Sequence, residues 1–444
     1  MNMPAYPVYK DSGVRWLGRV PSSWSVQPIN RRYQISLGKM LNGNISVTDG
    51  DMFPYLRAGN VQPRGLDLTE VKHIHLDTLE RKSFTLLRGD LVVVEGGAGY
   101  GRSAVLTEDL TGWGFQNHIM RVRPRGGDST RFLDYVIKTL SGNGHISTLS
   151  NHATIPSLSS EQLGRIVIPL PEEAEQDAIA NFLDRETTKI HALMDKQNQL
   201  IATLREDRSA TIAHAVTKGL NPETEMKDSG VEWLGAVPAH WITLPLKRLL
   251  AQPITDGPHE TPEFLDEGIE FISAEAVSTG KVIFDKRRGF ISHSDHLRYS
   301  AKYSPRLHDI FVIKSGATTG VAAIVTDEKV FDIWSPLAAI RPTDQHDPFF
   351  VLNFIRSDPF QRAIALSWTY GTQQNLGMGT LGNLHVAVPP FNEQRQIASL
   401  LEVAVGKIDA LIDKATEMIS TLREYQSALI SAVVTGKIDV REAA

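Results

Sequence analysis

The chain contains one long helical pattern twice, half its length apart. The first copy covers residues 175–218 and the second covers residues 393–436. A shift of 218 positions lays the run Thr-Leu-Arg-Glu at 203–206 on the identical run at 421–424. A chain that repeats so long an element is built from two half-molecules. At 1.5 Å per residue, each helix would be about 60 Å long.

In the second copy, apolar residues recur at alternating spacings of three and four, which is the pattern of a heptad seam. In the first copy, Glu186 and Gln197 interrupt the matching seam. The predicted seam residues are Leu183, Ile190, Leu193 and Leu204 in the first copy and Leu401, Ile408, Leu411, Leu422 and Leu429 in the second. Long helices gain most of their stability by packing an apolar face. The simplest partner for each helix is the other one. We therefore expect an antiparallel coiled coil with an internal pseudo-two-fold repeat.

A second repeat opens each half of the chain. Residues 10–24 read KDSGVRWLGRVPSSW and residues 227–241 read KDSGVEWLGAVPAHW, so 11 of 15 positions are identical. Asp-Ser-Gly is typical of turns, and Val-Pro closes the stretch. We interpret this repeat as a structural clasp, in which Trp16 and Trp24 pack onto the domain behind them.

Between each clasp and its helix lies a stretch of mixed α/β character. Strand-like runs in the first stretch lie at 52–56, 91–95, 118–122 and 165–168, and one helix is expected at about 131–140. The second stretch repeats this plan, with a helix near 349–355, and both stretches end in a proline hinge. We predict an α+β fold divided into residues 1–170, 171–222, 223–390 and 391–444.

Composition excludes several classes of protein. The chain has no cysteine, so it has neither disulfides nor thiolate metal sites. It contains no run of 18 apolar residues, and its N-terminus lacks the layout of a signal peptide. We expect a cytoplasmic protein that does not enter a membrane. The net charge of −5 does not exclude DNA binding, because charge can be segregated within a chain.

The search for catalytic motifs is negative. We find no phosphate-binding Gly-x-x-x-x-Gly-Lys-Ser/Thr loop, no His-Glu-x-x-His and no Gly-x-Ser-x-Gly. A glycine-rich loop follows the strand at 91–95, but Arg102 stands where a dinucleotide fingerprint needs its third glycine. A tight turn that brings backbone close to a large ligand explains these glycines better than a cofactor loop. We predict no catalytic residue and no metal site.

These features together resemble the specificity (S) subunits of Type I restriction-modification systems. The resemblance covers essentially the whole chain, and its most specific marks are the run PPFNEQRQI at 389–397, its partner at 169–179, and the paired KDSGVxWLGxVP openings. It implies two target recognition domains, at 1–170 and 223–390, which alternate with conserved helical spacers at 171–222 and 391–444.

The resemblance also implies a function and a set of partners. The chain would be a non-catalytic subunit whose two domains each read one half of a bipartite, asymmetric site in double-stranded DNA. Its helices would set the gap between the half-sites and dock two modification (methyltransferase) subunits. Restriction (translocase/nuclease) subunits would complete the complex. The chain would hold no cofactor, because S-adenosylmethionine, ATP and Mg would be bound by the partner subunits.

Base reading uses Arg or Lys for guanine and Asn or Gln for adenine, so polar loop residues at matched positions of the two domains are the DNA-binding candidates. In the first domain they are Lys39, Asn42, Arg57, Asn60, Arg64, Tyr100, Arg102 and Asn117. The loop at 255–262 resembles one that recurs in the recognition domains of the family. The candidates of the second domain are Thr255, Asp256, His259, Thr261, Ser273, Lys314, Thr318, Thr319, Gln373 and Gln374.

Two other functions fit parts of the sequence. Two adaptor domains on a coiled-coil spacer would bind proteins instead of DNA, and affinity for DNA that falls steeply with salt would separate the two alternatives. The third alternative is an enzyme with an unrecognised site. Absence of methyl transfer and DNA cleavage by the isolated chain would count against it.

Overall fold

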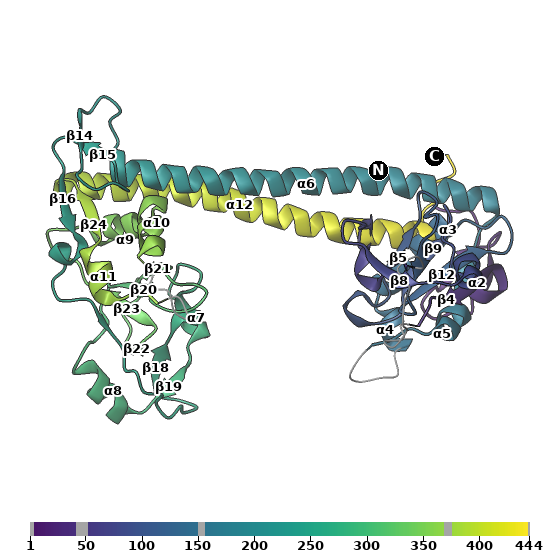
Figure 1. The fold of residues 1–444 in the computed structure, drawn as a ribbon, viewed down its shortest axis with the longest axis horizontal. Helices are drawn as coiled ribbons and strands as arrows, with labels where there is room; N and C mark the ends of the chain where they lie inside the picture. The colour runs from purple at the N-terminus through teal and green to yellow at the C-terminus, as the bar shows by residue number, and fades with distance from the viewer. Residues whose placement is uncertain (1–3, 41–51, 150–155, 368–374, 443–444) are drawn as a thin grey trace. The chain divides into compact units, whose positions relative to one another are not determined.

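The computed structural model describes residues 4–40, 52–149, 156–367 and 375–442. The chain forms two compact units, one of Met1–Gln197 with Glu417–Ala444 and the other of Asn198–Thr416. The long helices α6 (Glu173–Lys218) and α12 (Phe391–Val434), labelled in Figure 1, contribute to both. Each unit therefore contains the start of one long helix and the end of the other. No helix within the described ranges is long and apolar enough to cross a membrane.

The first unit contains two small sheets. A four-stranded antiparallel sheet has the order β10 (Ser103–Val105), β9 (Leu91–Val94), β12 (Ile119–Pro124) and β4 (Tyr33–Leu37). A three-stranded sheet has the order β11 (Gly114–Phe115), β5 (Met52–Leu56) and β8 (Lys72–His75), and only its β11–β5 pair is parallel. Helix α3 (Thr130–Gly142) packs its apolar face on the four-stranded sheet.

The second unit has the same strand orders. Its four-stranded sheet runs β21 (Ala322–Ile324), β20 (Ile310–Ile313), β23 (Leu337–Ile340) and β17 (Thr255–Asp256). Its three-stranded sheet runs β22 (Phe331–Ile333), β18 (Ile269–Ile272) and β19 (Gly289–Ile291), again with one parallel pair, β18–β22. Helix α9 (Pro348–Arg356) occupies the place of α3 in the order of elements. The α+β class predicted from the sequence is confirmed.

Shorter elements complete both units. The sequence predicted a single helix in each mixed domain, and the structure has several more. In the first unit they are α1 (Ile29–Arg32), α2 (Thr78–Ser83), α4 (His145–Leu149) and α5 (Ser160–Arg165), with the strand pair β6 (Val61–Gln62) and β7 (Gly65–Leu66). In the second they are α7 (Ala274–Val277), α8 (His293–Ser300), α10 (Asp358–Leu366) and α11 (Met378–Asn383). These helices have nine residues or fewer, too few for a clear helical periodicity.

A buried ion pair is repeated in the two four-stranded sheets. Asp90 is 2% exposed and accepts a 2.6 Å hydrogen bond from Arg123 Nε. Asp309 is 1% exposed and accepts a 2.7 Å hydrogen bond from Arg341 Nε. Such bonds between ionised groups are stronger than neutral ones. Both units thus keep the same internal anchor beneath their loops.

Each clasp is a short hairpin with a buried tryptophan. The strands are β1 (Tyr9–Asp11) with β2 (Arg19–Pro21), and β14 (Met226–Asp228) with β15 (Ala236–Pro238). Trp24 and Trp241 are fully buried. Trp24 lies against Gly436, just after α12, and Trp241 lies against Gly219, just after α6. Both glycines have positive φ, as expected where a helix ends. Each clasp therefore packs against the end of a long helix.

A buried glutamine anchors the start of each long helix. The Gln176 side chain accepts from Ser129 N at 2.9 Å and donates to Pro171 O at 3.0 Å. Gln394 accepts from Asp347 N at 2.9 Å and donates to Pro389 O at 2.9 Å. The four partners are related by the same shift of 218 positions. Each glutamine thereby ties a long helix to the start of α3 or α9.

The first predicted proline hinge lies in a paired strand, and the prolines of the second directly follow one. β13 (Val167–Leu170) contains Pro169 and pairs with β3 (Ser25–Pro28), and β24 (His385–Val388) pairs with β16 (Ile242–Pro245). Ile168 and Leu170 are buried. Proline is compatible with a two-stranded ladder, which leaves one edge of each strand unpaired. The link into each helix is therefore held by strand pairing and by glutamine.

Burial along the two helices departs from the predicted seam at one repeated position. Leu183, Ile190, Leu204, Leu401 and Leu429 are buried, and Ile408 and Leu422 are half-buried. Leu193 and Leu411 are instead 48% and 50% exposed. Their neighbours Met194 and Ile412 are less exposed and take their places. Alternation by four and then three puts these neighbours on the packed face.

The helix segments within each unit run antiparallel. In the first unit, Gln426 of α12 bonds His191 of α6 across 2.9 Å, and the C-terminal Arg441 lies 3.9 Å from Glu175. In the second, Arg208 Nε of α6 donates to Asp409 of α12 at 2.8 Å, and Gly219 approaches Glu393. Higher numbers on one helix therefore face lower numbers on the other. His191–Gln426 and Asp409–Arg208 are equivalent pairs under the shift of 218 positions.

Candidate nucleic-acid interface

Two glycines start the candidate DNA-reading loops at equivalent places. A Cβ atom on Gly38, which follows β4, would collide with the carbonyl oxygens of Phe115 and Gln116. A Cβ atom on Gly257, which follows β17, would collide with the carbonyl oxygen of Ile333. Only glycine permits so close a backbone approach. The loops predicted at matched scaffold positions therefore do leave the sheets in the same way.

The structure brings Lys39 and Asn117 together. The backbone N of Asn117 donates to Lys39 O at 2.9 Å, and the backbone N of Lys39 donates to Phe115 O at 2.8 Å. The Lys39 side chain is only 12% exposed, and its Nζ donates to Glu80 Oε2 at 2.5 Å and His75 O at 2.9 Å. Lys39 thus already has a carboxylate partner, whereas the half-buried Asn117 has no side-chain hydrogen bond among the described residues.

Asn60 and Arg57 support their own loop. Asn60 is 4% exposed, and its amide accepts from Arg57 N at 2.9 Å and donates to Asp67 O at 2.8 Å. Arg57 Nη2 donates to Glu70 O at 3.2 Å. These bonds hold the turn that carries β6 and β7. A base-reading role for Asn60 would require those bonds to break, so its contribution to DNA binding would be to shape the loop.

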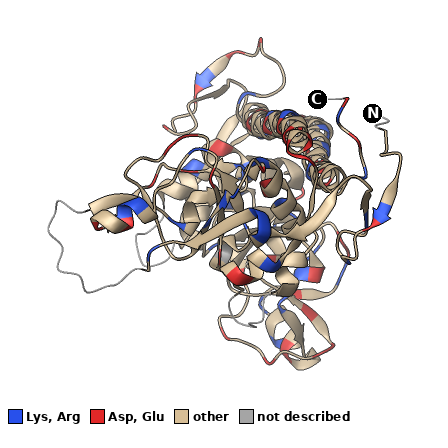
Figure 2. Ribbon diagram, turned by 90° about the vertical axis from the view of Figure 1, so that its right-hand side faces the viewer, with Lys and Arg blue, Asp and Glu red and all other residues tan. Residues whose placement is uncertain are grey.

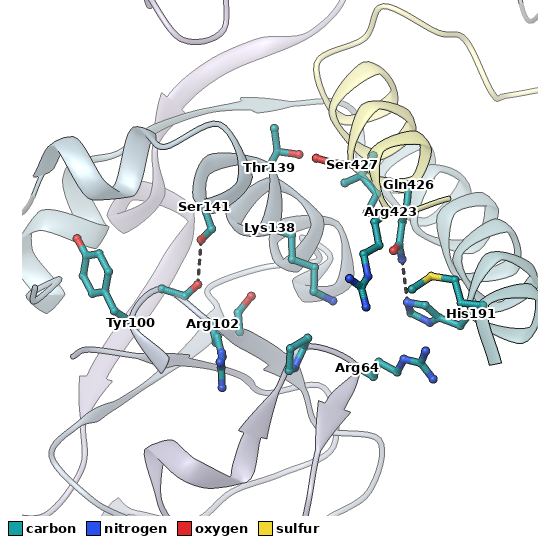
Figure 3. A pocket seen from close by; sticks show the side chains of 15 residues that line it. Arg64, Tyr100, Arg102, Lys138, Thr139, Ser141, His191, Arg423, Gln426 and Ser427 are labelled. Atoms are coloured by element: carbon teal, nitrogen blue, oxygen red, sulfur yellow. Dashed lines mark hydrogen bonds between the residues drawn. The ribbon is translucent and has the colours of Figure 1, made fainter. Parts of the chain in front are cut away.

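Arg64, Tyr100 and Arg102 are brought together on one cavity of the first unit (Figure 3). Arg64 Nη1 lies 2.9 Å from both Asp195 carboxylate oxygens, and both side chains are about half exposed. The Tyr100 hydroxyl donates to Ile146 O at 2.7 Å. Arg102 has no ion pair among the described residues. Of the three, Arg102 has the charge most available to a phosphate or a base.

In the second unit the candidates converge on Asp256. This carboxylate is 1% exposed, and the Nζ atoms of Lys302 and Lys314 each lie 2.6 Å from it. His259 Nε2 lies 3.1 Å from the same group. Burial opposes the charged form, but the two lysine hydrogen bonds outweigh it and lower the pKa of Asp256. The cluster carries a net positive charge, with Lys302 and His259 on its solvent side.

The remaining candidates of the second unit are dispersed. Thr255 lies in β17, Ser273 is 3% exposed, and Thr261 is on the surface. Thr318 is half-buried, and the Thr319 hydroxyl donates to Gly316 O at 2.7 Å in the loop after β20. Three candidates, Asn42, Gln373 and Gln374, lie outside the described residues.

One equivalent position carries opposite charge in the two units. Glu95 and Lys314 follow β9 and β20, and the backbone N of each donates to a carbonyl oxygen, at 2.9 Å to His118 and 2.7 Å to Pro336. The carbonyl oxygens of Glu95 and Lys314 accept in turn from Leu158 N at 2.7 Å and from Leu376 N at 2.8 Å. The same backbone frame thus presents an acid in one unit and a base in the other.

Glu95 was not among the residues predicted from the sequence. Its side chain is 24% exposed and lies 3.8 Å from the half-exposed His118. Burial raises the pKa of Glu95, and His118 opposes this shift. A carboxylate here can accept from the amino group of cytosine, which a lysine cannot do. The signal was present in the sequence, because the alignment of 89–93 with 308–312 continues to Glu95 and Lys314.

Basic and acidic residues are mixed in the part of the chain that Figure 2 shows, with Lys and Arg interspersed among Asp and Glu along the ribbon. In the described part of the chain, no group of three His, Asp or Glu side chains is arranged to hold a metal ion. The polar side chains of the candidate loops can form hydrogen bonds and ion pairs, which are the contacts that base edges and phosphates offer.

The comparisons with known proteins agree on one family. The model of the Type I restriction modification DNA specificity domain matches residues 21–202. The EcoBI specificity subunit of Escherichia coli is 24% identical over 66% of this chain, and the match spans 64% of that protein. The MjaIX specificity subunit of Methanocaldococcus jannaschii is 22% identical over 96% of both chains.

Two solved structures share the fold. A chain from a structure on complex assembly and conformational transition of the type I R-M system matches with a TM-score of 0.72 at 17% identity, covering 94% of this chain and 98% of that one. The HsdS subunit from Thermoanaerobacter tengcongensis matches with a TM-score of 0.53, also at 17% identity and with the same coverage. At 17% sequence identity, these matches show a shared fold only.

Proposed function

The chain is a relative of the specificity subunits of Type I restriction-modification systems, and on this premise we propose that it recognises DNA sequence for such a complex. The first unit's α/β domain reads one half of a bipartite, asymmetric site in double-stranded DNA, and the second unit's domain reads the other half. The chain itself is not catalytic. Methyl transfer belongs to two modification subunits, and translocation and cleavage belong to restriction subunits.

The proposal rests on one observation: the two units share a backbone scaffold but carry different side chains at equivalent loop positions. Both units repeat the strand orders, the buried Asp–Arg pair and the glycine that starts the first loop. On this frame the first unit presents Glu95 with His118, whereas the second presents Lys314 with Asp256 and His259. A protein that binds one repeated surface would have no use for this difference. Readers of two different half-sites require it.

The long helices have a second role in this proposal, which is to set the gap and dock the modification subunits. We infer that they form an antiparallel coiled coil with a pseudo-two-fold axis. Each unit leaves large apolar side chains exposed on these helices: Leu193, Met418 and Tyr425 in the first, and Leu200, Leu400, Val403 and Leu411 in the second. Exposed large apolar side chains that gather on one face of a helix would form such a docking surface.

The proposed roles of the subunits also determine which of them bind the cofactors. S-adenosylmethionine, ATP and Mg belong to the partner subunits in this proposal, and the specificity subunit supplies position and sequence. The candidate loops contribute hydrogen bonds and charge, which select a sequence but transfer no group. The two spacers, at 171–222 and 391–444, remain the proposed link between the recognition domains at 1–170 and 223–390.

The test is to co-express the chain with its modification subunit and map adenine methylation across the host genome. We expect one split motif that is methylated on both strands and interrupted by a gap of fixed length. Glu95→Gln should change the bases required for methylation in one half-site only. Lys314→Gln should change the bases required in the other half-site only. Lys39→Gln removes a lysine that is likewise paired with a carboxylate, but in the first unit, so it should leave the half-site of the second unit unchanged.

Two results would contradict the proposal. An assembled complex that methylates no motif would remove the recognition function. A motif in which one substitution altered both half-sites would remove the assignment of one half-site to each unit. Binding to protein ligands with no affinity for DNA at any salt concentration would instead favour the adaptor.

A further inference from the structure

A cavity of about 560 Å³ in the first unit is lined by basic residues (Figure 3). Arg64, Arg102 and Lys138 come from the α/β domain, and Arg423 comes from α12. No Asp or Glu lines it among the described residues. In Figure 3 the side chains of Lys138 and Arg423 point toward one another. Like charges placed together repel, so the arrangement favours an anion between them.

The carboxylates nearby do not neutralise all of this charge. Lys138 Nζ lies 2.7 Å from Asp134, and Arg64 is paired with Asp195. Neither Arg102 nor Arg423 has an ion pair within the described ranges. Asp134 also accepts a 2.6 Å hydrogen bond from the Ser103 hydroxyl. Two of the four guanidinium and ammonium groups are therefore open to a ligand.

A buried hydroxyl faces the same cavity. Thr139 is 6% exposed, and its Oγ1 atom has no hydrogen-bond partner in the described structure. Figure 3 shows it directed toward the Ser427 hydroxyl on α12. Leaving a buried hydroxyl without a partner costs about 1–3 kcal/mol. A ligand oxygen in this place would accept from it and remove that cost.

The equivalent positions of the second unit are satisfied internally. Under the shift of 218 positions, Arg356 replaces Lys138, and its guanidinium donates to Ala322 O at 3.1 Å and to Gly280 O. Ser357 replaces Thr139, and its hydroxyl donates to Phe354 O at 2.7 Å. Arg208, which replaces Gln426, is paired with Asp409. The second unit does have a cavity, of about 1120 Å³, at the equivalent place, but Glu402 and Asp409 line it beside Arg208 and Arg356. The cavity of the first unit differs in that, of the described residues, only basic and uncharged side chains line it.

We propose that this cavity binds a phosphate-bearing anion, with its phosphate between Arg423 and Lys138 and with Arg102 and Thr139 as further donors in the lining of the same cavity. Arginine suits phosphate because its planar fork donates two parallel hydrogen bonds. The volume is that of a site for a small organic ligand, and Met194 and Ile430 supply an apolar wall. A ring attached to the phosphate would lie against that wall. A free nucleotide and a DNA phosphodiester share the phosphate chemistry.

The experiment uses the full chain and two probes. Calorimetric titration with ADP tests the free ligand, and fluorescence anisotropy with a duplex tests DNA. We expect Arg423→Ala to weaken binding of the true ligand about ten-fold, the effect of losing one charge-assisted hydrogen bond. Thr139→Val keeps the shape, removes the hydroxyl and should weaken it a few-fold. Arg205→Ala, at the position equivalent to Arg423, is the matched control and should change neither affinity.

The two probes separate the sources of the phosphate. If the ligand is a free nucleotide, ADP binds saturably and both cavity variants lose ADP affinity while DNA affinity stays constant. If it is the DNA backbone, Arg423→Ala weakens all duplex sequences equally and lowers the salt slope by about one. Wild-type affinities for both probes in Arg423→Ala and Thr139→Val would overturn the proposal. A methylated motif that survives in these variants leaves sequence recognition intact, so the two proposals fail separately.

Discussion

Asp256 shows how one residue can decide the charge of a loop. It is 1% exposed, yet it stays ionised because Lys302 and Lys314 each place an Nζ atom 2.6 Å from its oxygens. Lys314 is itself buried, so the carboxylate and the ammonium stabilise one another away from water. Breaking such a pair by removing one partner typically costs about 3–5 kcal/mol, because the other charge is left buried and alone.

We predict that Asp256→Asn lowers the free energy of unfolding of the full chain by about 3–5 kcal/mol at neutral pH, measured by urea denaturation. The folded-state pKa of Asp256 lies below its ordinary value of 3.8. The stabilisation is therefore complete well above pH 3.8 and is lost as the pH falls through the lower, folded-state pKa. The difference between wild type and Asp256→Asn should shrink in the same range.

Lys302→Ala is the control for this pair, because its side chain is 53% exposed. It should cost about 1 kcal/mol or less. Equal decreases in the free energy of unfolding for Asp256→Asn and Lys302→Ala would contradict the assignment of Lys314 as the buried partner. A difference between wild type and Asp256→Asn that stays constant down to pH 3 would contradict the pKa argument.

The candidate residues show what could be predicted from the sequence. Glycines and strand ends located two matched loop starts, because Gly38 and Gly257 lie at equivalent places, although Thr255 and Asp256 lie in β17 itself. The partners of the candidate residues were not found. Lys39 pairs with Glu80 and Lys314 with Asp256, which are 41 and 58 positions away in the chain. A lysine with a distant carboxylate partner looks the same in a sequence as a lysine free to bind DNA.

At the scale of elements, the long helices were predicted almost to their ends. They begin at Glu173 and Phe391, two residues earlier than the predicted starts. The packed face was less well predicted, because apolar residues stand next to each other at Leu411 and Ile412 and at Met418 and Ile419. Periodicity alone cannot choose between such neighbours. In the structure, Ile419 lies on the packed face and is 7% exposed, whereas Met418 is 49% exposed.

Buried and exposed apolar side chains of α12 should respond differently to substitution. Ile419→Ala should lower the free energy of unfolding by about 2–5 kcal/mol, since it opens a cavity on the packed face. Leu411→Ala with Val403→Ala should change stability little, because both side chains are at least 50% exposed. The double variant should weaken binding of the modification subunit about ten-fold, as measured by calorimetry. Unchanged affinity for that subunit would place the docking surface elsewhere.

At the scale of the molecule, the chain repeats its scaffold and varies what the scaffold carries. The backbone N atoms of Ser129 and Asp347 bond equivalent glutamines, and Asp90 and Asp309 form ion pairs with equivalent arginines. The equivalent helix pair is instead neutral in one unit, His191 with Gln426, and charged in the other, Asp409 with Arg208. These repeated contacts hold each domain on its helices, so changes in the loops need not disturb the long helices.

If the helices set the gap, their length should control the site that is methylated. Three heptads inserted after Gln197 and three after Thr416 add 21 residues to each helix and about 31 Å to the spacer. Duplex DNA rises about 3.4 Å per base pair, so the gap should grow by about nine base pairs, close to one turn. The half-site sequences should not change, because no recognition loop is altered. Genome-wide mapping of methylated adenine measures both quantities.

The same insertion in α6 alone is the control, because the two helices would then differ in length and their antiparallel pairing could not be kept at both ends. It should abolish methylation of any split motif. A double insertion that still methylates the original motif with its original gap would show that the helices do not measure the DNA. In that case the gap would be set by the modification subunits, and the repeated helices would serve only to dock them.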